Sequence, residues 1–204
     1  MGNLQPNLSR PLKSPRSFIP EKEMQPIYKA NVFMIGSEKS VGQTSIATSF
    51  KHKRFIEVSP HHDNTMLFPL EIDSNDGSLV KLNLWDEKGE RRNYLSIALH
   101  CHQGAKAMVL TYDITRRESF NEVIDFWVHQ FSKEGRAKNM IVFLVGNKAD
   151  LEHQREVDTC YGATIARRYG MFFREVSAKT LKGIDELFES IAEECIHHFK
   201  RNEN

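Results

Sequence analysis

The chain has 204 residues, of which 40% are hydrophobic, and this suits one ordinary globular domain with a short extension. Its formal net charge of +1 gives no electrostatic argument for a nucleic acid partner or for a strongly anionic surface. No stretch approaches the roughly 20 apolar residues that span a bilayer, and residues 1–26 lack the apolar core of a secretory signal.

The first 26 residues are rich in proline and polar side chains. The prolines are Pro6, Pro11, Pro15, Pro20 and Pro26, with Ser, Asn and basic residues between them. Such a segment cannot bury enough apolar surface to offset the entropy lost on ordering, so we predict a disordered arm over residues 1–27. The folded domain is then expected over residues 28–200, followed by a short tail at residues 201–204.

Strand and helix patterns alternate from residue 28 onward. Apolar runs predict strands at residues 31–35, 67–72, 79–85, 107–112, 140–145 and 172–176. An Asp-Gly pair between the second and third runs predicts a hairpin turn. Helical spacing predicts helices at residues 44–52, 118–133, 159–169 and 184–199. The alternation predicts an α/β fold with a mainly parallel six-stranded sheet, one antiparallel edge strand and helices on both faces.

The most informative segment is Asn-Lys-Ala-Asp at residues 147–150, which directly follows the apolar run 140–146. Open α/β sheets bind ligands at the carboxyl ends of their strands, where this segment is expected to lie. A carboxylate there can accept both the N1–H and the exocyclic amine of guanine, whereas adenine has no donor at the first position. The segment therefore favours a guanine site. The alternative is a polar loop that merely closes a strand.

Three other segments favour the guanine interpretation. Ser-Ala-Lys at residues 177–179 follows a predicted strand, and its small residues would let backbone N–H groups approach a base oxygen. Asp-Glu-Lys-Gly at residues 86–89 ends another strand, where the carboxylate could hold magnesium through water and the glycine N–H could bind a phosphate. Val-Gly-Gln-Thr at residues 41–44 lies between a strand and a helix. This order of segments is unlikely to arise by chance.

With these segments the chain resembles the Ras superfamily of small GTPases over residues 30–198, and within it the Rab branch. Tyr-Asp-Ile-Thr at residues 112–115 and Tyr-Leu-Ser-Ile-Ala at residues 94–98 are similar to Rab patterns. The resemblance implies a G domain that binds GTP or GDP with Mg²⁺ and acts as a switch in vesicle trafficking. It also implies a cytoplasmic monomer whose effector and exchange-factor proteins bind through residues 55–72 and 89–103.

The resemblance also implies roles for individual residues. Guanine contacts fall on Asn147, Lys148, Asp150, Ser177, Ala178 and Lys179. Phosphate contacts fall on Gly36, Lys39, Ser40, Val41, Gly42, Gln43 and Thr44. Metal contacts fall on Thr44, Thr65 and Asp86, and the catalytic positions are Gly89 and Glu90.

The phosphate loop departs from the pattern Gly-x-x-x-x-Gly-Lys-[Ser/Thr]. Gln43 replaces the lysine, and five residues separate Gly36 from Gly42, so either the loop has one insertion or Ser37 takes the first glycine position. Loss of the ammonium should cost roughly 1.5–3 kcal/mol, about one to two decades of affinity. Lys39 is a candidate replacement, although we favour the alternative that it is a solvated lysine on an exposed loop.

The catalytic position is altered as well. Glu90 stands where the family has the glutamine that orients the attacking water. Its carboxylate would repel a γ-phosphate, although it could still accept a proton, so we expect slow or impaired hydrolysis. Thr65 departs from its pattern too, because Met-Leu follows it and it lies farther from Thr44 than in the family.

Rab proteins usually end in prenylated cysteines, whereas this chain ends without a cysteine in its last nine residues. We therefore expect no direct prenyl anchor and an indirect association with membranes through protein partners, with a truncated chain as the alternative. Two functional interpretations remain open. The first is a Rab-like switch with slow hydrolysis, and the second is a pseudo-GTPase that acts as a protein-interaction scaffold. A small kinase is disfavoured by the paired segments 147–150 and 177–179.

Overall fold

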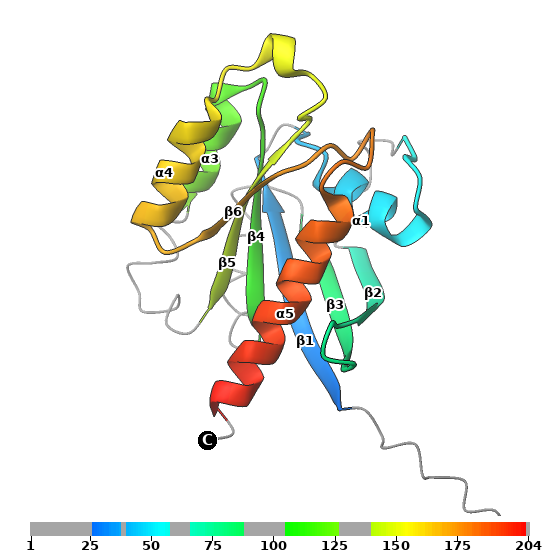
Figure 1. Cartoon of the computed structure of the whole chain (residues 1–204). Coiled ribbons are helices and arrows are strands. Elements are labelled where there is room, and N and C mark those ends of the chain that lie inside the picture. Colours follow the sequence, from blue (N-terminus) through cyan, green and yellow to red (C-terminus); the bar gives the residue numbers. More distant parts are fainter. Residues whose placement is uncertain (1–25, 38–39, 58–65, 88–104, 127–139, 203–204) are drawn as a thin grey trace, which may run out of the picture.

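The computed structural model describes residues 26–37, 40–57, 66–87, 105–126 and 140–202. They form one six-stranded sheet in the order β2-β3-β1-β4-β5-β6 (Figure 1). The strands are β1 (Ile27–Gly36), β2 (Met66–Asp73), β3 (Leu79–Glu87), β4 (Ala105–Asp113), β5 (Ile141–Asn147) and β6 (Phe172–Glu175). Only β2 is antiparallel to its neighbour, which confirms the predicted mainly parallel sheet with one antiparallel edge strand.

The predicted hairpin joins β2 to β3. Its turn is closed by Ser74 N–H, which donates to the carbonyl of Ser78 at 2.8 Å. Gly77 has a φ of 83°, a conformation that glycine adopts without strain, and the Asp76 carboxylate accepts the N–H of Ser78 at 2.9 Å. The Asp-Gly pair therefore marks the turn for a local reason, independent of the packing around it.

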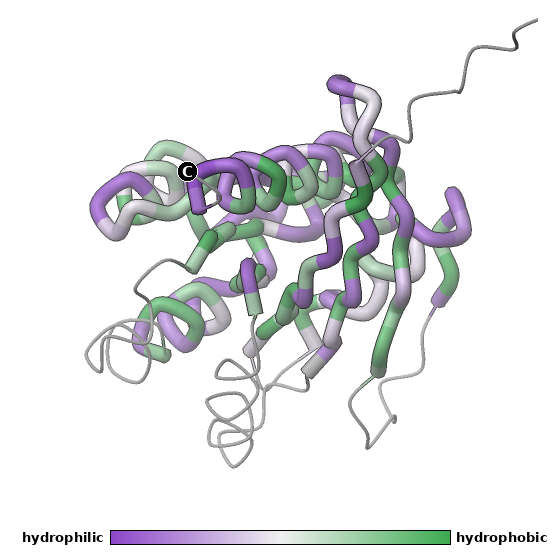
Figure 2. Tube along the Cα trace, turned by 90° about the horizontal axis from the view of Figure 1, so that it is seen from below, coloured by the Kyte–Doolittle hydropathy of each residue, from purple (hydrophilic) through white to green (hydrophobic). Residues whose placement is uncertain are grey.

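The helices cover both faces of the sheet, as predicted. They are α1 (Gln43–His52), α3 (Arg117–Phe126), α4 (Thr159–Arg168) and α5 (Ile184–Asn202). One buried cluster joins α1 and α5 to the sheet, and a second joins α3 and α4 to its other side. Figure 2 shows the helices as separate layers on the two sides of the strands. The core therefore has two halves divided by the sheet.

The interior strand β5, between β4 and β6, is buried along its whole length, which explains its continuous apolar sequence. Phe143 and Phe188 are fully buried in the α1 and α5 half of the core, and Cys195 lies beside them. Helix α5 continues to Asn202, three residues beyond its predicted end at 199. The predicted helix 118–133 is observed as α3 up to Phe126, and its remainder lies outside the described residues. Within the described part of the chain, no helix combines the length and apolar character needed to cross a bilayer.

Candidate functional site

The sheet order brings four strand ends together. β1 is flanked by β3 on one side and by β4 on the other, and β5 lies next to β4. These strands are parallel, so their carboxyl ends share one edge of the sheet. The strand order changes direction at β1, and ligands of open α/β sheets bind at the carboxyl edge beside such a reversal. The segments beginning at residues 37, 86 and 147 all lie at this edge.

The phosphate loop leads from the end of β1 into α1, and Gly42 is its last residue before the helix. Gly42 has φ 81° and ψ 27°, and a Cβ atom there would lie 2.5 Å from Nδ2 of Asn147. Glycine is therefore needed at position 42 both for its backbone conformation and for space. Helix α1 begins with no side-chain cap and no acidic residue in its first turn, so its first N–H groups and its positive dipole end suit an anion.

Gln43 links this loop to β3. Its buried carboxamide donates from Nε2 to Oδ1 of Asp86 at 2.6 Å. Its Oε1 lies so close to Gly36 that a Cβ atom added there would be 2.0 Å away. The side chain at the position of the family lysine is thus turned into the protein, between the end of β1 and the end of β3.

Thr44 and Asp86 meet as a metal site would require. The Thr44 hydroxyl donates to Oδ2 of Asp86 at 2.5 Å, and Asp86 is only 5% exposed. A hydroxyl and a carboxylate are oxygen ligands of the kind that Mg²⁺ prefers. These side chains therefore fit the predicted Mg²⁺ site, in which Thr44 would contribute its hydroxyl and Asp86 its carboxylate.

Asn147 connects the predicted guanine-binding segment, residues 147–150, to the phosphate loop. Its side chain is 2% exposed and donates from Nδ2 to the carbonyl of Val41 at 2.9 Å. Its Oδ1 accepts the backbone N–H of Ala178 at 3.1 Å. One buried amide therefore holds the loops at residues 41–42, 147–150 and 177–179 together. This role is additional to the base contact that the sequence predicted for Asn147.

The predicted base-reading carboxylate lies beside the segment 177–179. Asp150 is half-buried, and its Oδ1 accepts the hydroxyl of Ser177 at 2.6 Å. Within the described residues, Asp150 takes part in no ion pair. Ser177 is fully buried and also accepts the N–H of Thr180 at 3.1 Å, whereas Lys179 is exposed. The carboxyl group is thus oriented by a neutral hydroxyl and not by a cation.

Replacing Ser177 with Ala should lower the free energy of unfolding by about 2 kcal/mol, because the hydroxyl's bonds to Asp150 and Thr180 are lost together. Chemical denaturation of the nucleotide-free protein would measure the loss. Ser190→Ala is the control, since its hydroxyl only accepts a bond from exposed Arg174. Equal unfolding energies for the two variants would contradict a structural role for the Ser177 hydroxyl.

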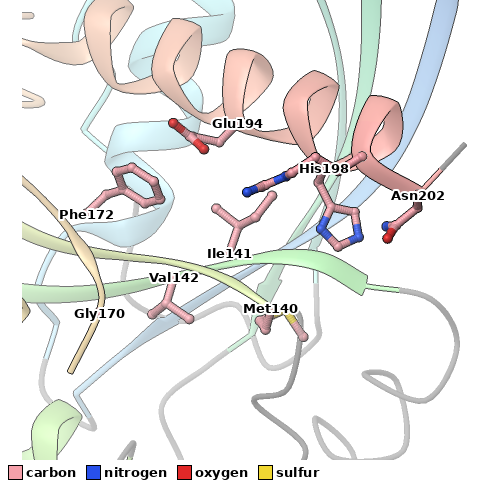
Figure 3. Close-up of a pocket in the computed structure, with 9 residues that line it drawn as sticks. Met140, Ile141, Val142, Gly170, Phe172, Glu194, His198 and Asn202 are labelled. Atoms are coloured by element: carbon pink, nitrogen blue, oxygen red, sulfur yellow. The ribbon is translucent and has the colours of Figure 1, made fainter. Parts of the chain in front are cut away.

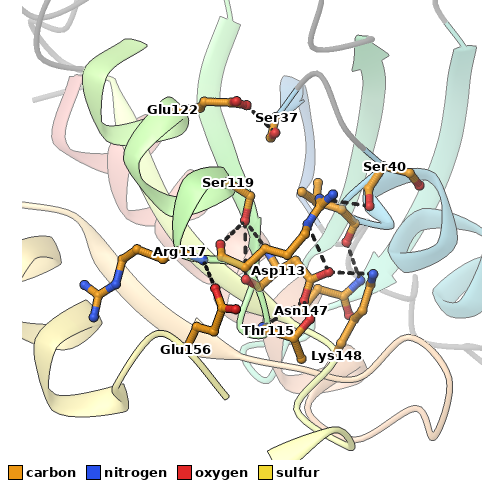
Figure 4. Close-up of polar contacts among 12 residues, drawn as sticks. Ser37, Ser40, Asp113, Thr115, Arg117, Ser119, Glu122, Asn147, Lys148 and Glu156 are labelled. Carbon is orange, nitrogen blue, oxygen red and sulfur yellow. Dashed lines mark hydrogen bonds and ion pairs between the residues drawn. The ribbon is translucent and has the colours of Figure 1, made fainter. Parts of the chain in front are cut away.

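Lys148 turns toward a buried carboxylate at the end of β4 (Figure 4). Its Nζ lies 2.6 Å from Oδ2 of Asp113, and Arg116 Nε lies 3.5 Å from the same oxygen. Thr115 donates to the other oxygen from its N–H at 2.9 Å and from its hydroxyl at 2.7 Å. Burial alone would raise the pKa of Asp113, but the hydrogen bonds from Lys148 and Thr115 outweigh it and hold the pKa below its ordinary value. Asp113 is therefore ionised at neutral pH.

Asp113 and Arg116 are absent from the residues that the sequence predicted for the site. Asp113 is the last residue of β4 and Arg116 lies three residues later, and β4 lies between β1 and β5 in the sheet. The end of β4 must therefore lie between the phosphate loop and the guanine segment. The strand order of the sheet, combined with polar residues after a buried strand, is the signal that could have identified them.

Several predicted site residues lie outside the described part of the chain: Lys39, Thr65, Gly89 and Glu90. The predicted partner-binding segment 89–103 also lies outside it, as do residues 58–65 of the segment 55–72. The alternatives for the phosphate-loop register and for Lys39 stay predictions for the same reason. The described part of segment 55–72 exposes apolar side chains at Phe55 and Leu67, which are 42% and 48% exposed.

An open groove of about 450 Å³ lies elsewhere, between the start of β5 and the last turns of α5 (Figure 3). Met140, Ile141 and Phe172 contribute apolar surface, and Glu194 and His198 of α5 contribute polar groups. These strand residues lie at the amino ends of β5 and β6, at the opposite edge of the sheet from Asn147. The groove is therefore separate from the candidate nucleotide site.

A comparison with protein families agrees with this geometry. A family model described as the Ras family matches residues 31–197. The matched segment runs from β1 into α5 and contains the described loops that meet at Asn147. It nearly coincides with residues 30–198, over which the sequence resembled the Ras superfamily.

Proposed function

Because the chain belongs to the Ras family of small GTP-binding proteins, we propose that it is a Rab-like guanine-nucleotide switch that hydrolyses GTP slowly. The observation that carries the proposal is the Asn147 side chain, which joins the phosphate loop to the segment 177–179. Such a link would hold the phosphate loop and the segment 177–179 in register for one nucleotide. The residues expected to read the base are present in the sequence, and the departures from the family pattern concern the phosphate end.

Guanine would bind against Asp150, whose carboxylate accepts the N1–H and the exocyclic amine. The bond from Ser177 orients the carboxylate without neutralising it. Backbone N–H groups of residues 177–179 would approach the base oxygen, and the Lys148 stem would lie along the base while its ammonium stays on Asp113. Hydrogen bonds to an ionised acceptor are stronger than neutral ones, so Asp150 should dominate the choice of base.

The phosphates would bind at the start of α1, where the N–H groups after Gly42 and the helix dipole favour an anion. Thr44 and Asp86 would hold Mg²⁺, which offsets the negative charge of the phosphates when it is bound. Gln43 contributes no charge there and donates to Asp86. The site should therefore bind phosphate more weakly than a loop with lysine. Glu90, at the position that the sequence assigns beside the γ-phosphate, would add like-charge repulsion.

The Rab-like assignment rests on the sequence patterns at residues 94–98 and 112–115. With it we propose a cytoplasmic protein of vesicle trafficking that reaches membranes through protein partners. Effectors and exchange factors would bind through residues 55–72 and 89–103. The exposed apolar side chains of Phe55 and Leu67 support the first of these surfaces.

A second candidate function is a pseudo-GTPase scaffold that needs no nucleotide turnover. One observation favours it: Asp86 is satisfied on both oxygens by Gln43 and Thr44. The phosphate end of the site is thus hydrogen-bonded internally, so the fold does not need a bound metal ion to satisfy the buried carboxyl group of Asp86.

Identification of the nucleotide released from purified, denatured protein separates the two functions. We expect close to one GDP or GTP per chain, followed by slow single-turnover hydrolysis of loaded GTP. Glu90→Gln should then hydrolyse GTP faster, because a neutral amide orients water without repelling the γ-phosphate. Protein that is purified empty and takes up neither labelled GDP nor GTP would support the scaffold.

A further inference from the structure

Arg116, which directly precedes α3, and Glu122 within α3 contact the two flanks of the phosphate loop (Figure 4). Arg116 donates from Nη2 to the backbone carbonyl of Ser40 at 3.2 Å. The hydroxyl of Ser37 donates to Oε2 of Glu122 on α3. Ser37 directly follows β1, and Ser40 precedes Val41 and Gly42 at the start of α1. A single segment, residues 116–122, therefore holds the loop on the β1 side and on the α1 side.

Arg116 is itself held in place. Its Nε lies 3.5 Å from the buried, ionised Asp113, and its backbone N–H donates to the Asp113 carbonyl at 3.0 Å. Asp113 is held in turn by Ser119, whose hydroxyl accepts the backbone N–H of Asp113 at 3.0 Å. The Arg116 side chain is 29% exposed, so much of it is ordered against the protein. The guanidinium is thus pre-organised where it meets the loop.

Charge at this place also favours an anion. Asp113 carries one negative charge and lies in ion-pair distance of two cations, Lys148 and Arg116. Two cations face one carboxylate on the Ser40 side of the loop, whereas Glu122 adds a negative charge at the Ser37 flank, so the excess positive charge is confined to the Ser40 side, where Gln43 provides none. Positive charge near an anion site raises the local concentration of the ligand and stabilises it once bound.

We propose that Arg116 is a positioning residue for nucleotide phosphates, with Glu122 as the second anchor of the loop. The inference rests on the proposed nucleotide-binding function and names what compensates for the missing lysine. Ordering a free loop on binding costs conformational entropy for each residue fixed. A loop that is already held at Ser37 and Ser40 avoids part of this cost, and pre-organisation of this kind increases affinity.

The test measures binding of GDP and of guanosine to the full chain by competition. Arg116→Ala should weaken GDP binding about three- to tenfold, the effect of one lost hydrogen bond, and leave guanosine binding unchanged. Arg116→Lys should recover part of the loss, because its ammonium keeps the charge. Arg117→Ala is the matched control, since Arg117 lies over the ring of Tyr161 at 4.9 Å and points away from Ser40 (Figure 4).

Hydrogen exchange of the backbone amides at residues 40–45 gives a readout independent of the ligand. We expect faster exchange in Arg116→Ala and Glu122→Ala than in Arg117→Ala, because each of the first two variants removes one anchor of the loop. If the unaltered protein binds GDP and Arg116→Ala binds it equally well, the inference is wrong and the proposed function stands. A parallel loss of GDP and guanosine binding would also overturn it. If the unaltered protein binds no nucleotide, the proposed function fails. In that case, equal hydrogen exchange at residues 40–45 in the unaltered protein and in Arg116→Ala would separately show that Arg116 does not hold the loop.

Discussion

Replacing Asp150 with Asn should lower the affinity for GDP by at least about a hundredfold, because two charge-assisted hydrogen bonds of roughly 1.5–3 kcal/mol each depend on the carboxylate. Guanine offers donors at N1 and at its exocyclic amine. An amide has one acceptor and one donor, so its NH₂ group would face the guanine amine. The Ser177 hydroxyl can still donate to the amide oxygen, so the loop should keep its conformation.

The same substitution should favour xanthine nucleotides. Xanthine has a carbonyl in place of the exocyclic amine, and an amide can accept from N1–H while it donates to that carbonyl. The variant should therefore bind XDP more tightly than GDP, the reverse of the unaltered protein. A general loss of folding would weaken both nucleotides and could not produce this reversal.

Competition of GDP and XDP for a fluorescent guanine nucleotide, with calorimetric titration of the variant, would measure the change. Asp125→Asn is the matched control, since Asp125 is exposed on α3 and the substitution removes the same charge. The control should bind GDP as the unaltered protein does. If Asp150→Asn keeps its preference for GDP over XDP, then Asp150 does not read the base and the guanine assignment fails.

Much of the fold could be predicted because local sequence patterns determine it. The buried strand β5 needs apolar side chains on both faces, so its sequence is a continuous apolar run. The β2–β3 turn needs an Asp-Gly pair for its own backbone geometry. The end of α5 was harder to predict, because the last turn of a helix is often polar and lacks the apolar spacing that marks its middle.

The site could be predicted only in part, because several of its contacts join residues far apart in the sequence. Asn147 was expected at a guanine pocket, but its bond to Val41 spans 106 positions and appears only when β5 and β1 are placed in the sheet. The contact of Arg116 with Ser40 spans 76 positions. The nature of a ligand can be inferred from a short segment, whereas the residues that support the segment depend on the strand order.

Gln43 illustrates the same limit within one residue. The sequence shows that the family lysine is missing, but it does not show where the replacing amide lies. The structure places it on Asp86, in a buried hydrogen bond of 2.6 Å. The amide therefore occupies the space between β1 and β3 and orients the carboxylate of the predicted metal site. Any restoration of lysine must replace this bond as well as add a charge.

Gln43→Lys should raise the affinity for GDP about ten- to a hundredfold, since a charge-assisted bond to phosphate contributes roughly 1.5–3 kcal/mol. Without nucleotide, the ammonium can donate to Asp86 in place of the Gln43 amide, so the buried carboxylate keeps a partner. With nucleotide, the long lysine stem can turn to the phosphates, because the Mg²⁺ that Thr44 and Asp86 would hold then satisfies Asp86. The gain should be absent for guanosine, which carries no phosphate.

Gln154→Lys provides the control for net charge, because Gln154 is exposed in the short helix Glu152–Gln154 after the guanine segment. It adds the same charge without placing it at the start of α1, so its effect on GDP affinity should be small and should disappear with added salt. The Gln43→Lys gain should persist in salt, since position 43 is buried. If Gln43→Lys binds GDP no better than Gln154→Lys, then the affinity for the phosphates is limited by the geometry of the phosphate loop and not by the missing lysine ammonium. Arg116 would then be compensating for loop shape, and the charge at position 43 would have no part in the weak phosphate contact.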